Sequence, residues 1–175
     1  FRFAGAWQNG RLPPGLYDGN LGPALFLAAA ARVTGSDTYR AASLAAVQSF
    51  ASEGRMGATL AAAAKSGPGI GKGLASLAYG FLKIGDPLQL SQVHDSCRVF
   101  AKALHDTHTP LGGQIDVLSG SAGDIIALAE VNKSMPDSHW LTAISARADH
   151  MLGQHKDEGH WFTGRTGFAH GAGGM

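Results

Sequence analysis

A glycine-rich segment followed by an apolar segment occurs four times in the chain at a nearly constant interval. The copies contain Gly22, Gly73, Gly123 and Gly174, which are separated by 51, 50 and 51 residues. A period held to within one residue over four copies indicates a repeat architecture, in which each repeat is one supersecondary unit. The chain has 25 glycines. Since a glycine inside a helix costs about 0.5–1 kcal/mol, we expect most of them at turns and close helix contacts.

Each glycine-rich turn precedes a segment that is apolar on all sides, which is the pattern of a buried helix. The first of these helices is expected to begin at Pro23 and to end at Gly35. The apolar positions of the second and third are Leu74, Leu77, Ala78, Phe81, Leu82, Ile125, Ile126, Leu128 and Ala129. We expect these helices to form the inner layer of the fold.

A helix with one apolar face is expected after each buried helix. One is predicted over about 38–51 with Ser36 or Asp37 as its N-cap, a second is predicted to start at Asp86-Pro87, and a third at 135–137. The positions expected to face the core are Leu44, Val47 and Ala51, then Leu90, Val93, Cys97, Phe100 and Leu104, then Leu141, Ile144, Ala148 and Met151. The polar positions expected to face water on the first of these helices are Arg40, Ser43 and Gln48.

No segment shows the alternation of a strand, so the chain is predicted to be all-α. Parallel inner helices with outer return helices stack side by side, at about 50 residues per repeat. A fully apolar inner layer favours an α/α toroid over an open solenoid, whose concave face would be wet. We predict a partial α/α toroid in a single incomplete domain over 1–175. We interpret the chain as a piece of a longer protein, since Phe1 is no initiator Met and Met175 lies in the expected fourth inner helix.

Composition excludes several classes of function. A net charge of +1 with 15% charged residues provides no basic field for nucleic acid. No apolar run reaches the roughly 18–20 residues that span a bilayer. The single cysteine, Cys97, excludes an internal disulfide and fits a reducing cytoplasm. We expect Cys97 to be a small core residue on its apolar stripe.

Polar residues precede the predicted inner helices. If those helices are parallel, their N-termini converge at one end of the toroid and carry partial positive charge, which favours anions such as a thiolate or an enolate. The residues just before the helices are Asp18, Asp116 and His170, with Lys72 in the second turn. We expect them to gather around one depression.

Three segments resemble the lanthionine synthetase C-like cyclases: GLYDGNLGPALFLAAAARVTGSDTY, DVLSGSAGDIIALA and TGFAHGAGG. The similarity is greatest to the C-terminal cyclase domain of the bifunctional class II lanthipeptide synthetases. The resemblance implies an α/α toroid with a catalytic Zn²⁺. It also implies a precursor peptide with a leader as partner, in which cysteine thiols add to dehydroalanine or dehydrobutyrine and form thioether rings.

The resemblance also implies roles for three residues. His170 matches the histidine of the GF-x-HG motif, which protonates the enolate or assists in deprotonating the thiol. Asp116 matches the aspartate of D-x-x-x-G-x-x-G and is expected to orient or tune that histidine, while Asp18 in YDG is expected to be structural or supporting. The family's zinc ligands, two cysteines and a histidine, follow the GF-x-HG motif. The chain ends five residues after His170, so we expect this fragment to lack the zinc ligands and not to cyclise peptides alone.

Two other functions stay open. One is a binding module of the same family that holds a thiol compound or peptide without forming rings. The other is a carbohydrate-active α/α toroid with Asp18 and Asp116 as acid and base, which requires carboxyl separations of about 5–5.5 or 6.5–9.5 Å. His105 and His108 have the spacing of a metal pair, but we interpret them as part of a solvated loop. We also expect the fragment to self-associate through the apolar flanks of its outermost hairpins.

Overall fold

The computed structural model describes residues 2–3, 6–7, 12–107, 114–158 and 167–171. The elements in chain order are β1 (Arg2–Phe3), β2 (Ala6–Trp7), α1 (Leu21–Thr34), α2 (Asp37–Ala51), α3 (Glu53–Lys65), α4 (Gly73–Leu88), α5 (Ser91–Asp106), α6 (Ser121–Ser134) and α7 (Ser138–Glu158). The strands β1 and β2 are a short antiparallel pair of two residues each. The remaining elements are helices, so the all-α prediction is confirmed.

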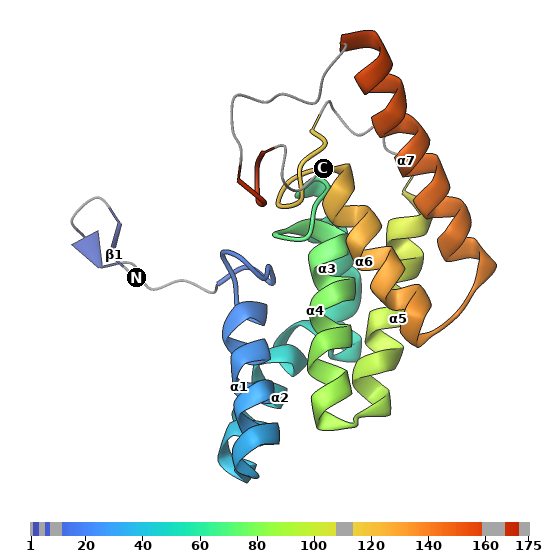
Figure 1. Cartoon of the computed structure of the whole chain (residues 1–175). Coiled ribbons are helices and arrows are strands. Elements are labelled where there is room, and N and C mark those ends of the chain that lie inside the picture. Colours follow the sequence, from blue (N-terminus) through green and yellow to red (C-terminus); the bar gives the residue numbers. More distant parts are fainter. Residues whose placement is uncertain (1, 4–5, 8–11, 108–113, 159–166, 172–175) are drawn as a thin grey trace.

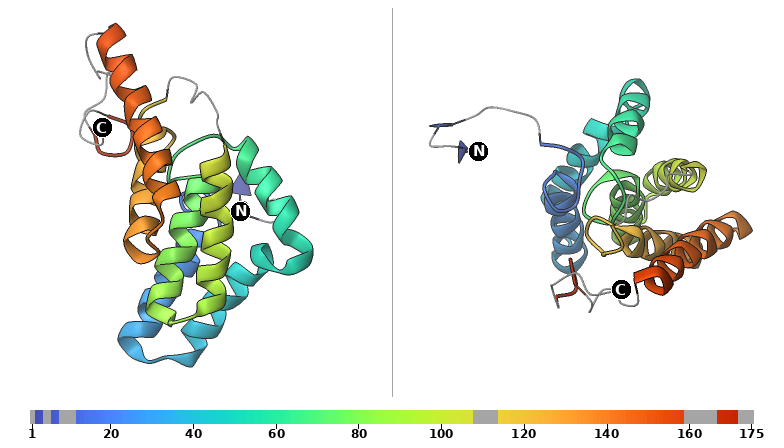
Figure 2. Two further views of the ribbon diagram at one scale, coloured as in Figure 1. Left: turned by 90° about the vertical axis from the view of Figure 1, so that its right-hand side faces the viewer. Right: turned by 90° about the horizontal axis from the view of Figure 1, so that it is seen from above.

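The helices α1, α4 and α6 run side by side in the same direction and form the inner layer (Figure 1). The helices α2, α5 and α7 return antiparallel to them on the outside, as the view from above in Figure 2 shows. The helix α4 is central and packs against α1, α3, α5 and α6. The predicted hairpins with parallel inner helices are therefore present, and the described residues form a partial α/α toroid. The fourth inner helix predicted after Gly174 lies outside the described residues.

The core lies between α4 and its neighbours. Phe81 of α4 and Phe100 of α5 are almost fully buried, and their ring centroids are 5.1 Å apart. Burial of each such side chain contributes about 1.5–3 kcal/mol. The predicted apolar stripe of α5 is confirmed, because Val93, Cys97 and Leu104 are also buried.

The first inner helix is less buried than predicted. Leu21 and several alanines of α1, such as Ala28, are buried. Phe26, however, is 71% exposed and Val33 is 85% exposed. The reason is the position of α1 at one end of the inner row, where α2 and α4 pack against it and cover one face. Its limits agree closely with prediction, since Gly35 ends it with a left-handed φ of 71°.

The core-facing stripes of two outer helices are largely as predicted but bury additional polar side chains. The predicted positions that pack in the core are Leu44, Val47 and Ala51 of α2 and Ile144 and Met151 of α7. Ser43 of α2, expected to face water, is fully buried and its hydroxyl donates to Ala24 O at 2.8 Å. Leu141 of α7, expected in the core, is 53% exposed. Trp140 is buried in its place, and its indole N–H donates to Met135 O at 3.1 Å. Arg147 of the same helix is buried as well.

The boundary between α4 and α5 was predicted too early. Asp86-Pro87 does not start the outer helix, because α4 continues through Pro87 to Leu88. Gln89 then takes a left-handed conformation with a φ of 54°, and its N–H closes the helix on Asp86 O. Pro87 has no N–H, so the last turn of α4 lacks one backbone hydrogen bond. The hydrogen bond from the Gln89 N–H compensates for this loss. In α2, the predicted N-cap is confirmed, since Ser36 Oγ accepts from the Tyr39 N–H at 3.4 Å.

The helix α3 was not predicted. Its sequence contains Gly54 and Gly57 and has no clear apolar stripe. In the fold it packs against α2, α4 and α5 and buries Thr59 and Ala63. The helix accounts for much of the long connection between the first two repeats. None of the helices in the described ranges is both long and apolar enough to cross a bilayer.

Candidate functional site

The glycine-rich segments before the inner helices meet at one end of the inner layer, at the upper ends of α1, α4 and α6 in Figure 1. We call them loop 1 (12–20), loop 2 (66–72), loop 3 (114–120) and loop 4 (167–171). Backbone hydrogen bonds join them in this order. The bonds, with the donor first, are Tyr17 N–H to Gly71 O at 3.2 Å, Ile70 N–H to Val117 O at 3.0 Å, Gly71 N–H to Leu118 O at 3.0 Å and Leu118 N–H to Ala169 O at 3.0 Å. The predicted convergence of the turns is confirmed for the described residues.

Glycine is required where these loops touch. Gly69 has a φ of 102°, and a Cβ on it would lie 2.4 Å from Leu118 O. A Cβ on Gly123 would lie 2.0 Å from Val117 O and 2.4 Å from Ile70 N. No side chain fits at such distances from backbone atoms, so the repeated glycines permit the backbone contacts between loops 2 and 3.

The structure brings two of the predicted site residues together. His170 Nδ1 lies 3.2 Å from Asp116 Oδ2, although the residues are 54 positions apart in the chain. The other carboxylate oxygen, Oδ1, accepts the Ser119 N–H at 2.6 Å. A hydrogen bond within loop 3 thus holds the Asp116 side chain in place. The hydrogen bond from the Leu118 N–H to Ala169 O places His170 beside it.

This arrangement selects one form of the imidazole. An ionised carboxylate only accepts hydrogen bonds, so Nδ1 of His170 carries the proton that faces Asp116. In neutral His170, the lone pair is then on Nε2. The His170 side chain is 36% exposed and that of Asp116 is 15% exposed. The pair can therefore exchange a proton with a molecule bound at the loops, with Asp116 as the group that orients the ring.

An apolar groove lies next to the pair. Its volume is about 420 Å³, and its lining includes Tyr17, Tyr79 and Phe168 together with aliphatic side chains from loops 1, 2 and 3 and from α6. No charged side chain of the described residues lines it. Val117 directly follows Asp116, and Phe168 lies two residues before His170. Pockets for ligands are typically of this size and character, with a few polar groups that fix orientation.

Asp18 lies apart from this pair. Its side chain is exposed, and it lines a separate cavity of about 150 Å³ with Ser66 and Lys72. Asp18 is not among the residues that line the apolar groove, and the contacts of Asp116 described above are with Ser119 and His170. Its Oδ1 is so close to Gly15 that a Cβ there would lie 2.5 Å away. Asp18 thus lies against the backbone turn of loop 1. The structure brings Asp116 and His170 within 3.2 Å of each other, and the expected depression shared by all three residues stays a prediction.

No group of three or more His, Cys, Asp or Glu side chains in the described ranges could hold a metal ion. Cys97 is fully buried and its thiol donates to Ala78 O at 3.2 Å. Burial is the main cause that raises the pKa of this thiol to about 12. Cys97 is therefore a core residue, as predicted.

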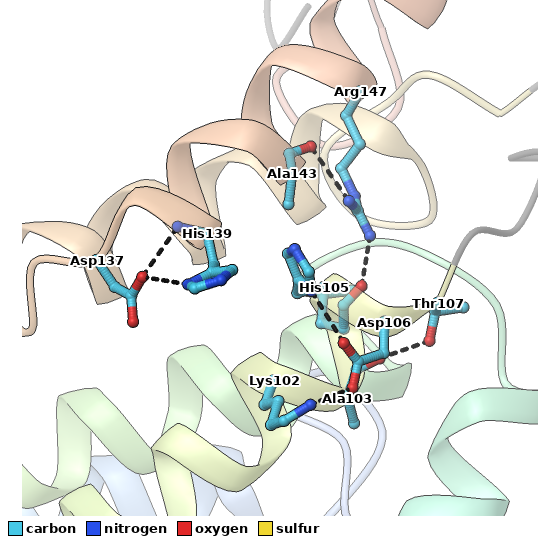
Figure 3. A network of polar contacts seen from close by, with 10 residues as sticks. Lys102, Ala103, His105, Asp106, Thr107, Asp137, His139, Ala143 and Arg147 are labelled. Carbon is cyan, nitrogen blue, oxygen red and sulfur yellow. Dashed lines mark hydrogen bonds and ion pairs between the residues drawn. The ribbon is translucent and has the colours of Figure 1, made fainter.

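The predicted loop around His105 is instead the last turn of α5, and His108 lies outside the described residues. Figure 3 shows His105 facing His139 of α7, with ring centroids 5.7 Å apart. The Nδ1 atom of His105 lies 2.9 Å from Asp106 Oδ1, and that of His139 lies 2.6 Å from Asp137 Oδ1. A hydrogen bond from Lys102 and, to a smaller extent, one from His105 lower the pKa of Asp106. These contacts join the end of α5 to the start of α7.

A further carboxylate, not predicted as functional, lies under the loops. Asp124 in the first turn of α6 is 1% exposed. Its Oδ1 accepts the Gly69 N–H at 2.8 Å, and its Oδ2 lies 3.3 Å from Arg147 Nε. Burial raises the pKa of Asp124, while the Gly69 bond and the charge of Arg147 act in the opposite direction. The signal in the sequence was a single carboxylate among apolar residues at a helix start.

Parallel inner helices with outer return helices define an α/α-toroid protein. An imidazole–carboxylate pair is held between its glycine-rich loops at one end. The family model described as lanthionine synthetase C-like protein matches residues 10–175. The chain therefore belongs to the lanthionine synthetase C-like family. No curated protein matches the chain.

Proposed function

We propose that the chain is part of a lanthionine-forming cyclase of the class II lanthipeptide type, which acts in the cytoplasm on a precursor peptide with a leader. The observation that carries this proposal is the contact of His170 Nδ1 with Asp116 Oδ2 at 3.2 Å beside an apolar groove. Both residues match motif positions of the family to which the chain belongs.

The reaction needs a proton to move between two substrate atoms. In the addition of a thiol to dehydroalanine, the sulfur bonds to Cβ, the double-bond electrons form an enolate, and Cα then takes a proton. Neutral His170 with its proton on Nδ1 accepts the thiol proton at Nε2 and returns it to Cα. Asp116 stabilises the imidazolium that exists between these two transfers. General acid–base catalysis of this kind typically contributes about 10²- to 10⁴-fold.

The Zn²⁺ expected from the family would lower the thiol pKa. The described residues do not fit such a site, since they contain no group of three potential ligands and Cys97 is buried in the core. The zinc that the resemblance implies stays a prediction.

The first alternative is a binding module of the same family without cyclase activity. Such a module would have the same groove and loops, so only a measurement of catalysis distinguishes it from a cyclase. The second alternative, a carbohydrate-active enzyme, needs Asp18 and Asp116 as a pair. No observation favours it, because Asp116 is engaged by Ser119 and His170 while Asp18 lines a different cavity.

The test uses the full-length protein with zinc and a synthetic peptide that contains one dehydroalanine and one cysteine. Ring formation leaves the peptide mass unchanged but removes the thiol, so it is followed by loss of alkylation. We expect His170→Ala to lower kcat/KM by about 10²- to 10⁴-fold. We expect Asp116→Asn to lower it by at least about tenfold, because the ring loses its orienting carboxylate.

A matched control is the exposed pair of His139 and Asp137, which has the same contact type on the surface of α7. His139→Ala and Asp137→Asn should leave kcat/KM unchanged. Wild-type protein that binds the peptide without consuming its thiol would favour the binding module. Full activity in a folded His170→Ala variant would refute the assignment of His170.

A further inference from the structure

One buried ion pair connects loop 2 to three helices. Asp124 is 1% exposed and Arg147 is 6% exposed. Besides its contact with Asp124, Arg147 donates to Leu104 O at 2.7 Å and to Ala143 O at 3.2 Å. Figure 3 shows Arg147 reaching from α7 towards the end of α5. The two side chains thus tie together α5, α6, α7 and the Gly69 N–H of loop 2.

The bond to Gly69 fixes the part of loop 2 that holds the other loops. Ile70 and Gly71 follow Gly69 directly, and their N–H groups donate to loop 3. Leu118 of loop 3 accepts one of these bonds and donates to Ala169, the neighbour of His170. A continuous path of hydrogen-bonded backbone therefore leads from Asp124 to Ala169, the residue before His170.

Stability alone is a weak reason for such a pair. Replacing a buried ion pair by apolar side chains of similar volume is often neutral or stabilising. An apolar replacement at Asp124 would, however, leave the Gly69 N–H without its acceptor under the loops. A missing partner for a buried backbone group costs about 1–3 kcal/mol and frees the segment to move. The ion pair therefore differs from an apolar core because it supplies an acceptor for the Gly69 N–H.

We propose that Asp124, held by Arg147, is a positioning residue that fixes loop 2 and, through loops 3 and 4, keeps His170 against Asp116. It touches no substrate and acts through the backbone bonds of Gly69, Ile70 and Gly71. The catalytic consequence of this positioning rests on the proposed function, but the positioning itself does not.

The decisive variant is Asp124→Leu/Arg147→Met, which replaces the ion pair by apolar side chains. We expect it to fold, with amide hydrogen exchange at Ile70, Gly71 and Leu118 at least about fivefold faster, as expected for the loss of one buried hydrogen bond. The nitrogen chemical shifts of the His170 imidazole report which ring nitrogen carries the proton. We expect the preference for Nδ1 to fall, because the ring is no longer held against Asp116.

Two further variants sharpen the test. Asp124→Asn retains an oxygen that accepts the Gly69 N–H, so it should preserve the His170 tautomer better than the double variant does. Glu130→Gln removes a different ion pair between α6 and α4, that of Glu130 with Lys83, and should change neither readout.

A folded double variant with wild-type exchange at loop 2 and an unchanged His170 tautomer overturns the proposal. If the double variant does not fold, Asp124→Ala, measured at low temperature with the same two readouts, decides by the same criteria. Neither readout depends on ring formation. A positive result in a protein that forms no thioether therefore upholds the positioning role while the proposed function fails.

Discussion

At the scale of single residues, Asp116 and Asp124 lie eight positions apart but have opposite surroundings. The Asp116 side chain is 15% exposed and contacts an imidazole that solvent reaches. Asp124 is 1% exposed and contacts a guanidinium in the core. The first carboxylate is therefore much more accessible to water than the second. The first therefore suits chemistry, while the second suits the support of a loop.

We expect Asp124→Ala to destabilise the fold by about 3–5 kcal/mol, because it leaves the charge of Arg147 buried without its partner. Glu130→Gln removes an ion pair whose side chains are 30% exposed, and should cost less than about 1 kcal/mol. Urea denaturation followed by circular dichroism measures both. Equal losses of stability in the two variants would show that the buried ion pair contributes no more than the partly exposed one.

Cys97 is expected to react slowly in the folded chain. Since burial raises its pKa to about 12, almost no thiolate is present at pH 8.5, whereas an unfolded thiol with a pKa near 8.5 is about half ionised. Stability linked to this thiol is complete below about pH 8.5 and is lost as the pH rises towards 12. Alkylation rates with and without urea check the reactivity, and Cys97→Ala should remove this part of the pH dependence. Rapid alkylation without unfolding would contradict the burial of Cys97.

The contact between His170 and Asp116 could be predicted because both residues precede expected inner helices at the repeat interval. Asp124 could not be assigned a partner in the same way. The expected stripe of α7 was based on apolar residues and included Leu141, whereas the helix in fact buries Trp140 and Arg147. A stripe defined by apolar residues alone therefore misses a buried charge.

At the scale of elements, local capping accounts for most agreements and disagreements with the sequence. Gly35 and Ser36 lie where the end of α1 and the start of α2 were expected. The end of α4 is set by Gln89 in a left-handed conformation, which no residue pattern predicts for glutamine. The helix α3 has weak intrinsic signals and gains its place by packing, so propensity alone could not reveal it.

Two glycines, one at the end of a helix and one inside a helix, provide a matched test of the assigned helix boundaries. Gly35 has a φ of 71°, so Gly35→Ala should destabilise the fold by about 1–2 kcal/mol although no atom lies within 4 Å of its added Cβ. Gly57 lies inside α3 with the same open surroundings. Gly57→Ala should stabilise the fold by about 0.5–1 kcal/mol. Thermal unfolding of both variants gives the signs, and a shift in the same direction for both would contradict the assigned end of α1.

At the scale of the whole molecule, the inner row has an open side along α1. Phe26 and Val33 on this side are 71% and 85% exposed. Large apolar patches are unusual on monomeric proteins. The single incomplete domain that we predicted over 1–175 and its self-association both stay predictions.

We expect the chain to self-associate with rising concentration, and we expect Phe26→Ser/Val33→Ser to weaken this association. Val99→Ser on α5 is the control, because Val99 is 42% exposed away from the inner layer. Sedimentation velocity over a range of concentrations measures the effect. A wild-type chain that sediments as a monomer throughout would contradict the prediction.

The loops are joined through main-chain atoms, and this has a consequence for protein engineering. The links from Tyr17 to Gly71 and from Leu118 to Ala169 use no side-chain atom. Outward-facing side chains such as Tyr17 and Phe168 can therefore be randomised in a library while the scaffold around His170 stays intact. Under the proposed function, such a library would change which peptides the groove accepts, and its members should share a common backbone.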